Sequence, residues 1–221
     1  VRENNEDAVV TTRIDDRIIA VVCDGVSASR DAHLAAEIAS ETTRASLVVA
    51  EGDPGAAMEH ALRSAHEAIC AAQSRRGGEP MGTTVVAATI QGAHVTIGWV
   101  GDSRAYWLGD DEALLLTHDH SWLEEAMAAG VTTWEEAIRS PFAHALTRCL
   151  GPLEGGDDSH AEPDVVEATV HGHGWVVLCS DGLWNYAPTA EELASLAQAG
   201  GNDANGIARA LVSMALSRGG Q

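Results

Sequence analysis

Lysine is absent from this sequence of 221 residues, and all 13 basic residues are arginine. This absence excludes lysine nucleophiles, Schiff bases and the lysine-dependent phosphate loop of nucleotide hydrolases. Positive charge is scarce altogether, because 33 acidic residues give a formal net charge of −20 at pH 7. Nucleic acids and anionic membranes bind basic patches, so neither is expected as a partner. A phosphate substrate would need metal ions and arginine, which grips phosphate bidentately, to reverse the local field.

Long apolar runs and paired cysteine motifs are also missing. No stretch approaches the roughly 20 apolar residues of a membrane span, and no signal segment is visible. The cysteines lack CxxC spacing and lie in apolar contexts, which indicates buried free thiols in a reducing compartment. They are Cys23, Cys70, Cys149 and Cys179. We therefore expect a cytoplasmic, monomeric protein with one domain over residues 1–221. The sequence begins without methionine, inside what looks like a motif, so we expect both ends to be trimmed.

The pattern of apolar residues predicts an α+β protein. Alternation predicts a hairpin over residues 8–24 that turns at Asp15-Asp16. Runs rich in Val, Thr and Ile with short connections predict an antiparallel meander. These runs are 83–91, 93–100, 104–108 and 113–117. Further apolar patterns predict helices 31–49, 56–74, 190–199 and 204–217 and strands 165–170 and 175–179. Grouped strands with long helices outside them favour two antiparallel sheets covered by helices.

Residues 120–151 form a loop-rich insert between the predicted strands. Two short helical patches lie around Trp122 and Trp134, and Ser140-Pro141 marks a turn. We interpret residues 120–145 as a lid, because long inserts of this kind often carry function. The alternative is a rigid packed excursion held by the two tryptophans.

Two apolar runs end in an acidic residue followed by glycine, at Asp24-Gly25 and at Asp181-Gly182. Each pattern predicts a buried strand with one carboxylate at its end. With the acidic residues of 2–7 and with Asp102, at least five carboxylates can converge on one site. Clustered carboxylates repel one another unless a hard cation neutralises them, and oxygen-only ligands favour Mg²⁺ or Mn²⁺ over zinc. The residues therefore predict a metal-dependent hydrolase.

Each candidate residue also has an ordinary structural interpretation. An aspartate before glycine often forms a turn, and Asp102 can cap a turn through its side chain. Asp119 is interpreted as fixing the start of the lid rather than binding metal. His118 and His120 suggest zinc, as do His171 and His173, but no further ligand lies nearby at finger-like spacing. Gly82-Thr83-Thr84 is interpreted as a packing element rather than a phosphate cradle.

A cysteine nucleophile with an arginine six positions on is a second phosphatase chemistry. Cys70 and Arg76 match that spacing. They lie on the strongest predicted helix, with no glycines between them to form an anion-binding loop. We interpret Cys70 as a helix-packing residue.

Seven motifs occur in a characteristic order along the chain. They are Arg2-(three residues)-Glu6-Asp7, Asp24-Gly25, Gly82-Thr83-Thr84, Gly101–Tyr106, Leu116–Ser121, Leu146–Gly151 and Cys179–Trp184. With these motifs the chain resembles the metal-dependent serine/threonine protein phosphatases of type 2C, in their compact bacterial form. The resemblance implies an αββα four-layer sandwich with a centre of two Mn²⁺ or Mg²⁺ ions that activate a water.

The resemblance also implies roles for individual residues. Asp24 should bridge both metals, the Gly25 carbonyl should bind the first, and Asp181 should bind the second. Glu6 and Asp7 should surround the first metal, mainly through its waters. The two remaining roles belong to Arg2, which should hold the substrate phosphate, and to Asp102, which should help to hold a third, weaker metal.

The implied activity is hydrolysis of phosphoserine and phosphothreonine in proteins phosphorylated by serine/threonine kinases. The chain departs from the family pattern at Val26-Ser27-Ala28, where Val26 cannot act as a general acid, and at His171–Gly174. The family also continues, from the position of Gln221, into an Asp-Asn pair whose aspartate binds the second metal. The altered Val26-Ser27-Ala28 stretch and the missing aspartate motivate one alternative, a pseudophosphatase that binds phosphoproteins or serves as a regulatory scaffold. An Arg2 side chain that is merely solvated is a further alternative.

Overall fold

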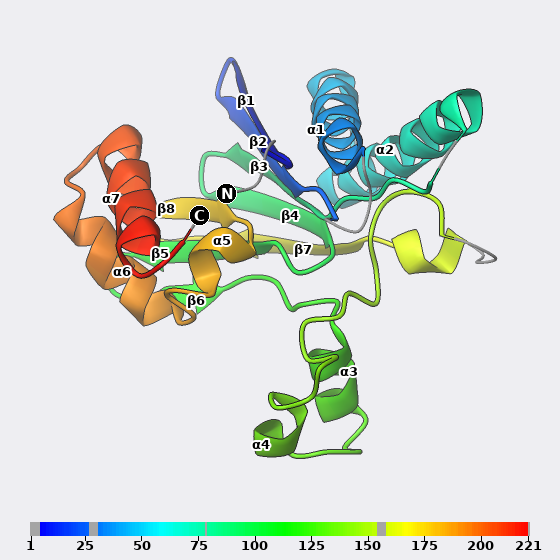
Figure 1. Ribbon diagram of the computed structural model, residues 1–221. Coiled ribbons are helices and arrows are strands. Elements are labelled where there is room, and N and C mark those ends of the chain that lie inside the picture. The colour runs from blue at the N-terminus through cyan, green and yellow to red at the C-terminus, as the bar shows by residue number, and fades with distance from the viewer. Residues whose placement is uncertain (1–4, 27–30, 78, 154–157, 221) are drawn as a thin grey trace.

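Two antiparallel sheets form the centre of the molecule (Figure 1). The structure is a computed structural model that describes residues 5–26, 31–77, 79–153 and 158–220. The first sheet has the order β1-β2-β3-β4-β7 and the second the order β6-β5-β8. The first comprises β1 (Asp7–Ile14), β2 (Arg17–Asp24), β3 (Val85–Gln91), β4 (His94–Val100) and β7 (Asp164–Thr169). The second comprises β5 (Arg104–Gly109), β6 (Ala113–Leu115) and β8 (Gly174–Cys179).

Helices cover the outer faces of both sheets (Figure 1). The first sheet carries α1 (Ala32–Val49) and α2 (Pro54–Arg76), and the second carries α6 (Ala190–Ala199) and α7 (Ala204–Ser217). Local sequence fixes where these helices begin. The side chain of Asp53 accepts a hydrogen bond from the Ala56 amide at the start of α2, and Pro54 occupies the first turn, where its missing N–H has no cost.

Alternation along the strands builds three apolar layers. On β2, Ile19, Val21 and Cys23 are fully buried towards α1 and α2, whereas Val22 packs with residues between the two sheets. This is the period of two expected for a strand buried on both faces. A third cluster joins the second sheet to α6 and α7 through residues such as Leu193. Three apolar layers between four structural layers give the predicted αββα sandwich.

The predicted single meander is wrong at Gly101, because β4 and β5 belong to different sheets. The chain crosses between the sheets over Gly101–Ser103. Gly101 has φ +109°, and a Cβ at this position would lie 2.7 Å from the Cβ of Thr84. A short connection can lead to the facing sheet as well as to a neighbouring strand, so connection length did not decide the pairing. The crossing places Asp102 between the sheets' ends.

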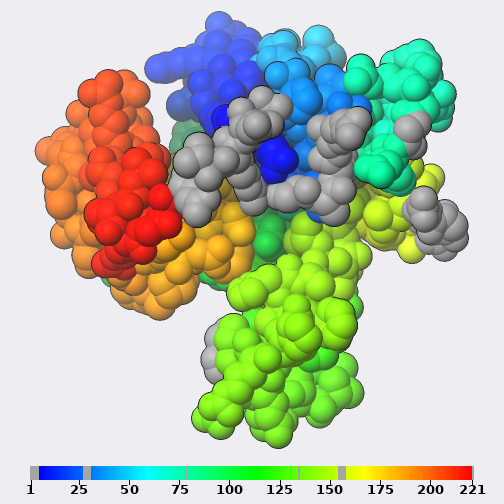
Figure 2. Space-filling view, in the orientation of Figure 1, coloured from blue at the N-terminus to red at the C-terminus, as the bar shows by residue number. Residues whose placement is uncertain are grey.

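The predicted lid segment contains α3 (Trp122–Ala128) and α4 (Trp134–Ala137). Both lie away from the two sheets, and Figure 2 shows this part of the chain as a lobe that projects from the rest of the molecule. Two short elements were not predicted, η1 (Asp158–Ala161) and α5 (Asp181–Trp184). Within the described ranges, none of the helices is both long and apolar enough to cross a bilayer.

Candidate metal centre

The first two strands bring four predicted site residues together. Asp7 at the start of β1 lies opposite Asp24 at the end of β2, and the Gly25 amide donates to the Glu6 carbonyl at 3.1 Å. Burial, and then the charges of Asp24 and Asp7, raise the pKa of the Cys23 thiol. The register of a single hairpin thus gathers two carboxylates beside the backbone of Glu6 and Gly25.

The Gly82-Thr83-Thr84 motif fixes the backbone of Asp24. The Asp24 carbonyl accepts from the Thr83 hydroxyl at 2.9 Å and from the Thr84 amide at 2.8 Å, while its amide donates to the Thr84 hydroxyl at 3.2 Å. The Thr84 hydroxyl also lies 2.7 Å from that of Ser103, next to Asp102. The motif therefore connects the Asp24 turn to the Asp102 turn, in agreement with its interpretation as a packing element.

Asp102 and Asp181 lie in one acidic environment. Asp181 opens α5, and the indole Nε1 of Trp184 at the end of that helix donates to the Asp102 carbonyl at 2.9 Å. Burial raises the pKa of the Asp102 carboxyl to about 7, and the charges of Asp181 and Asp119 contribute to the rise. Repulsion of this kind is what a bound cation relieves.

Arg104 neutralises Asp119 next to this acidic group. Its Nε and one terminal nitrogen donate to the two carboxylate oxygens of Asp119 at 2.8 and 2.7 Å. Its guanidinium also lies 3.9 Å from the ring centroid of Trp184, a cation–π arrangement. Asp119 is therefore engaged in an ion pair. The residue that caps α3 is Ser121, whose hydroxyl accepts from the Glu124 amide, so the role of Asp119 at the start of the lid stays a prediction. The sequence identified neither the role of Arg104 nor that of Trp184.

The donor set fits a hard divalent cation. It consists of carboxylates and one backbone carbonyl, the oxygen ligands that Mg²⁺ and Mn²⁺ prefer. The turns that carry these residues meet through the hydrogen bonds of Thr84 and Trp184. Among the described residues, however, the three side chains whose ligand atoms lie within 4.8 Å of one another are His118, His120 and Asp164, not these carboxylates. The candidate ligands are Glu6, Asp7, Asp24, Gly25, Asp102 and Asp181. Their individual assignments stay predictions. Arg2, the predicted phosphate-binding residue, lies outside the described residues.

The cysteine alternative finds no support in the structure. All four cysteines are free. Cys70 lies on α2, and burial raises the pKa of its thiol, with the charge of Asp158 adding to the effect. A reactive cysteine needs the opposite shift, towards the thiolate.

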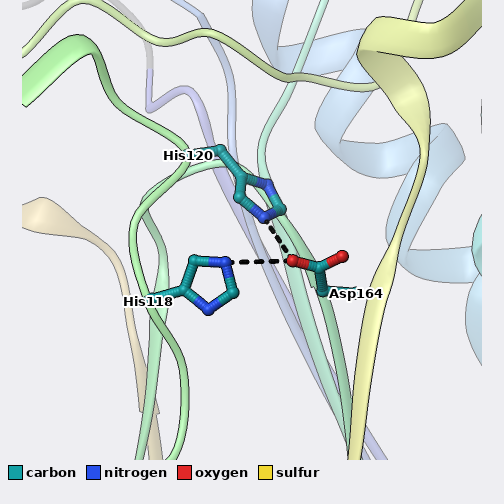
Figure 3. Close-up of side chains that lie close together, drawn as sticks. All are labelled: His118, His120 and Asp164. Atoms are coloured by element: carbon teal, nitrogen blue, oxygen red, sulfur yellow. Dashed lines mark hydrogen bonds and ion pairs between the residues drawn. The ribbon is translucent and has the colours of Figure 1, made fainter. Parts of the chain in front are cut away.

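His118 and His120 have a third neighbour that the sequence did not reveal. Asp164, at the start of β7, has its Oδ2 3.0 Å from His118 Nε2 and 3.1 Å from His120 Nε2 (Figure 3). The three side chains offer metal-ligand atoms within 4.8 Å of one another. However, the Gly101 amide donates to His120 Nδ1 at 3.0 Å. A neutral imidazole that accepts at Nδ1 carries its proton on Nε2, so Nε2 donates to Asp164 and is not available as a ligand.

A four-layer sandwich with an oxygen-only acidic centre at the sheet ends defines a metal-dependent phosphatase architecture. The chain belongs to the protein phosphatase 2C family, whose sequence model matches residues 3–221.

Related proteins agree with this assignment. The chain is 34% identical over 200 residues to the serine/threonine phosphatase stp of Listeria innocua, which covers 86% of this chain and 77% of that protein. It is similar to the crystal structure of the Mycobacterium tuberculosis serine/threonine phosphatase PstP/Ppp, with a TM-score of 0.82 and 28% identity over 100% of this chain and 89% of the other. A structure of the PstP catalytic domain in complex with two manganese ions aligns with a TM-score of 0.76 and 28% identity, over 100% of this chain and 88% of the other. These comparisons confirm the predicted family and fold.

Proposed function

We propose that this protein hydrolyses phosphoserine and phosphothreonine in phosphoproteins, using two Mn²⁺ or Mg²⁺ ions. The observation that carries the proposal is the convergence of the Asp24, Asp102 and Asp181 turns at one end of the sandwich. Membership of the protein phosphatase 2C family and the two manganese ions of the PstP catalytic domain support it.

The chain's own residues have distinct roles in this proposal. The carboxylate of Asp24 and the carbonyl of Gly25 would hold the first cation, with Glu6 and Asp7 around its hydration shell. Asp181 would hold the second. When bound, such a pair of ions supplies a water of lowered pKa and neutralises charge on the phosphate. Thr83 and Thr84 keep Asp24 in place through three hydrogen bonds to its backbone.

Two further residues complete the site. Arg2 would donate to the equatorial phosphate oxygens, where positive charge stabilises the transition state. Asp102 would help to hold a third, weaker ion. Val26, whose amide donates to the Gly82 carbonyl at 2.9 Å, has an apolar side chain and offers no proton to the leaving group.

Turnover of p-nitrophenyl phosphate separates an enzyme from a pseudophosphatase. The proposal requires hydrolysis that depends on Mn²⁺ and that Asp24→Ala and Asp181→Ala nearly abolish. Arg2→Ala should raise KM and lower kcat/KM, because it weakens phosphate binding. Metal-dependent binding of a phosphopeptide without any turnover would instead establish the scaffold alternative.

We propose that the substrates are products of serine/threonine kinases and that the protein acts in bacterial signalling, in the cytoplasm and as a monomer. The free cysteines suit a reducing compartment. A preference for phosphothreonine over phosphotyrosine peptides in a phosphate-release assay tests the substrate class. The mass in solution, from light scattering after size exclusion, tests the monomer.

We further propose that residues 120–145, within the single domain 1–221, act as a substrate-selecting lid. A cavity of about 190 Å³ lies between this segment and the acidic centre. Its lining includes Asp102, Glu124, His144 and Trp184. A protein substrate that reaches Asp102 therefore passes the lid, whereas a small phosphate ester has fewer contacts with it.

A further inference from the structure

His120 binds both backbone groups of Gly101, the residue before the predicted ligand Asp102. The His120 amide donates to the Gly101 carbonyl at 3.0 Å, and the His120 Nδ1 accepts from the Gly101 amide at 3.0 Å. The His120 residue is only 3% exposed. On the opposite side, Thr84 packs so closely against Gly101 that no side chain fits there. The turn that carries Asp102 is therefore held from two sides.

The far side of the imidazole is fixed as well. Its Nε2 donates to Asp164, whose other oxygen accepts from Arg148 at 3.3 Å. His118 contacts the same oxygen of Asp164 but is exposed, and no hydrogen bond joins its side chain to Gly101 within the described residues. Of these two histidines, it is His120 whose side chain connects the Asp164 carboxylate to the Gly101 backbone. Figure 3 shows the two imidazoles approaching Asp164 from neighbouring positions of one segment.

His120 also joins the two ends of the lid. Its carbonyl accepts from the Thr147 amide at 3.0 Å, on the segment that returns from the lid. Directly after it, Ser121 forms a β-bridge with Leu146. The outgoing and returning segments of the lid are thus paired at His120, one hydrogen bond away from the turn that carries Asp102.

We propose that His120 is a positioning residue that holds the Gly101–Asp102 turn in the geometry needed for the weaker metal and couples this turn to the lid. Asp164 orients the imidazole and fixes its tautomer. The inference rests on the proposed role of Asp102, and it adds a residue that binds neither metal nor substrate.

Two substitutions at His120 test its hydrogen bond to Gly101 and its hydrogen bond to Asp164 separately. In His120→Asn, the amide oxygen takes the place of Nδ1 and can still accept from Gly101, but contact with Asp164 is lost. In His120→Gln, the longer amide reaches Asp164 and leaves the Gly101 amide without its acceptor. Mn²⁺ binding is measured by calorimetry on the full chain without substrate, with thermal unfolding as the test of folding. Asp102→Ala identifies the weak site, and His118→Ala is the matched control.

We expect His120→Gln to weaken Mn²⁺ binding at the site that Asp102→Ala removes by about tenfold, equivalent to about 1.4 kcal/mol. His120→Asn should stay within about threefold of the wild type, and His118→Ala within about twofold, since neither removes the acceptor for Gly101. The tighter sites should be unchanged in all three. The binding isotherms need no turnover. An inactive protein would therefore refute the proposed function, but Mn²⁺ binding by the variants could still be compared with that of the wild type.

Three results would overturn the inference. The first is that His120→Gln and His120→Asn lower the melting temperature but change Mn²⁺ affinity at the weak site equally, or not at all. His120 would then only support the fold. The second is the absence of any Mn²⁺ site sensitive to Asp102→Ala. The third is stoichiometric zinc binding that both His118→Ala and His120→Asn abolish, which would show that the histidines are ligands.

Discussion

The indole Nε1 of Trp184 donates a hydrogen bond of 2.9 Å to the carbonyl of Asp102. Trp184 ends α5, the helix that Asp181 begins. Two predicted metal ligands that are 79 positions apart in the chain, 181 − 102, are therefore tied by one short helix. Arg104 covers the indole ring and adds a second constraint on its position.

Trp184→Phe should weaken this connection while keeping an aromatic ring in place. Loss of one buried hydrogen bond costs on the order of 1 kcal/mol, and the orphaned Asp102 carbonyl adds to the cost. Urea unfolding of the metal-free protein measures the effect. Trp107→Phe is the matched control, because Trp107 is also buried but its Nε1 has no hydrogen-bond partner among the described residues. Equal destabilisation by the two substitutions would contradict the importance of the bond.

Asp119→Ala should destabilise the protein by about 3–5 kcal/mol, because it leaves the guanidinium of Arg104 without its partner in a largely buried place. The exposed pair Arg63–Glu162 serves as the control, since Glu162→Ala should change stability little. Both are measured by denaturant unfolding. A small effect of Asp119→Ala would mean that Arg104 finds water or another partner.

Mild acid should destabilise the metal-free protein through His120. Burial lowers the pKa of His120 from its ordinary value of 6.5, and the charge of Arg148 acts in the same direction, while Asp164 opposes them. The unfolded chain therefore binds a proton at higher pH than the folded chain does. The stability that neutral His120 contributes is complete above pH 6.5 and is lost as the pH falls from there towards the folded pKa.

Unfolding measured in EDTA between pH 7.5 and pH 5.5 tests this pH dependence. His120→Asn should flatten the profile, because asparagine does not titrate. Identical slopes for the wild type and His120→Asn would assign the acid sensitivity to other groups.

Exchanging residues 122–145 for the matching segment of a related phosphatase should change the rate on a phosphoprotein at least severalfold. It should leave the rate on p-nitrophenyl phosphate almost unchanged, because the small ester has few contacts with the lid. The exchange keeps His120 and Thr147, so the base of the lid is preserved. A parallel fall of both rates would show that the segment supports the fold.

The sequence predicted most elements because their signals are local. Alternation over residues 8–24 predicted β1 and β2, and the Asp-Gly tips placed Asp24 and Asp181 at strand ends. The sheet change at Gly101 was missed, since alternation shows that a strand is buried but not which sheet it joins. The contact of His120 with Asp164 was missed for a similar reason: the two residues are 44 positions apart. They meet because β7, which Asp164 begins, pairs with β4, and because His120 binds Gly101 directly after β4.

The dependence of phosphate release on Mn²⁺ tests the central claim most directly. Protein freed of metal with EDTA is titrated with Mn²⁺, and hydrolysis of a phosphothreonine peptide is followed. We expect no turnover in EDTA and a saturable return of activity at millimolar Mn²⁺ or Mg²⁺, because the donor set is oxygen-only and such ions keep several waters. Full activity in excess EDTA, or activity that only zinc restores, would contradict the metal centre proposed at Asp24.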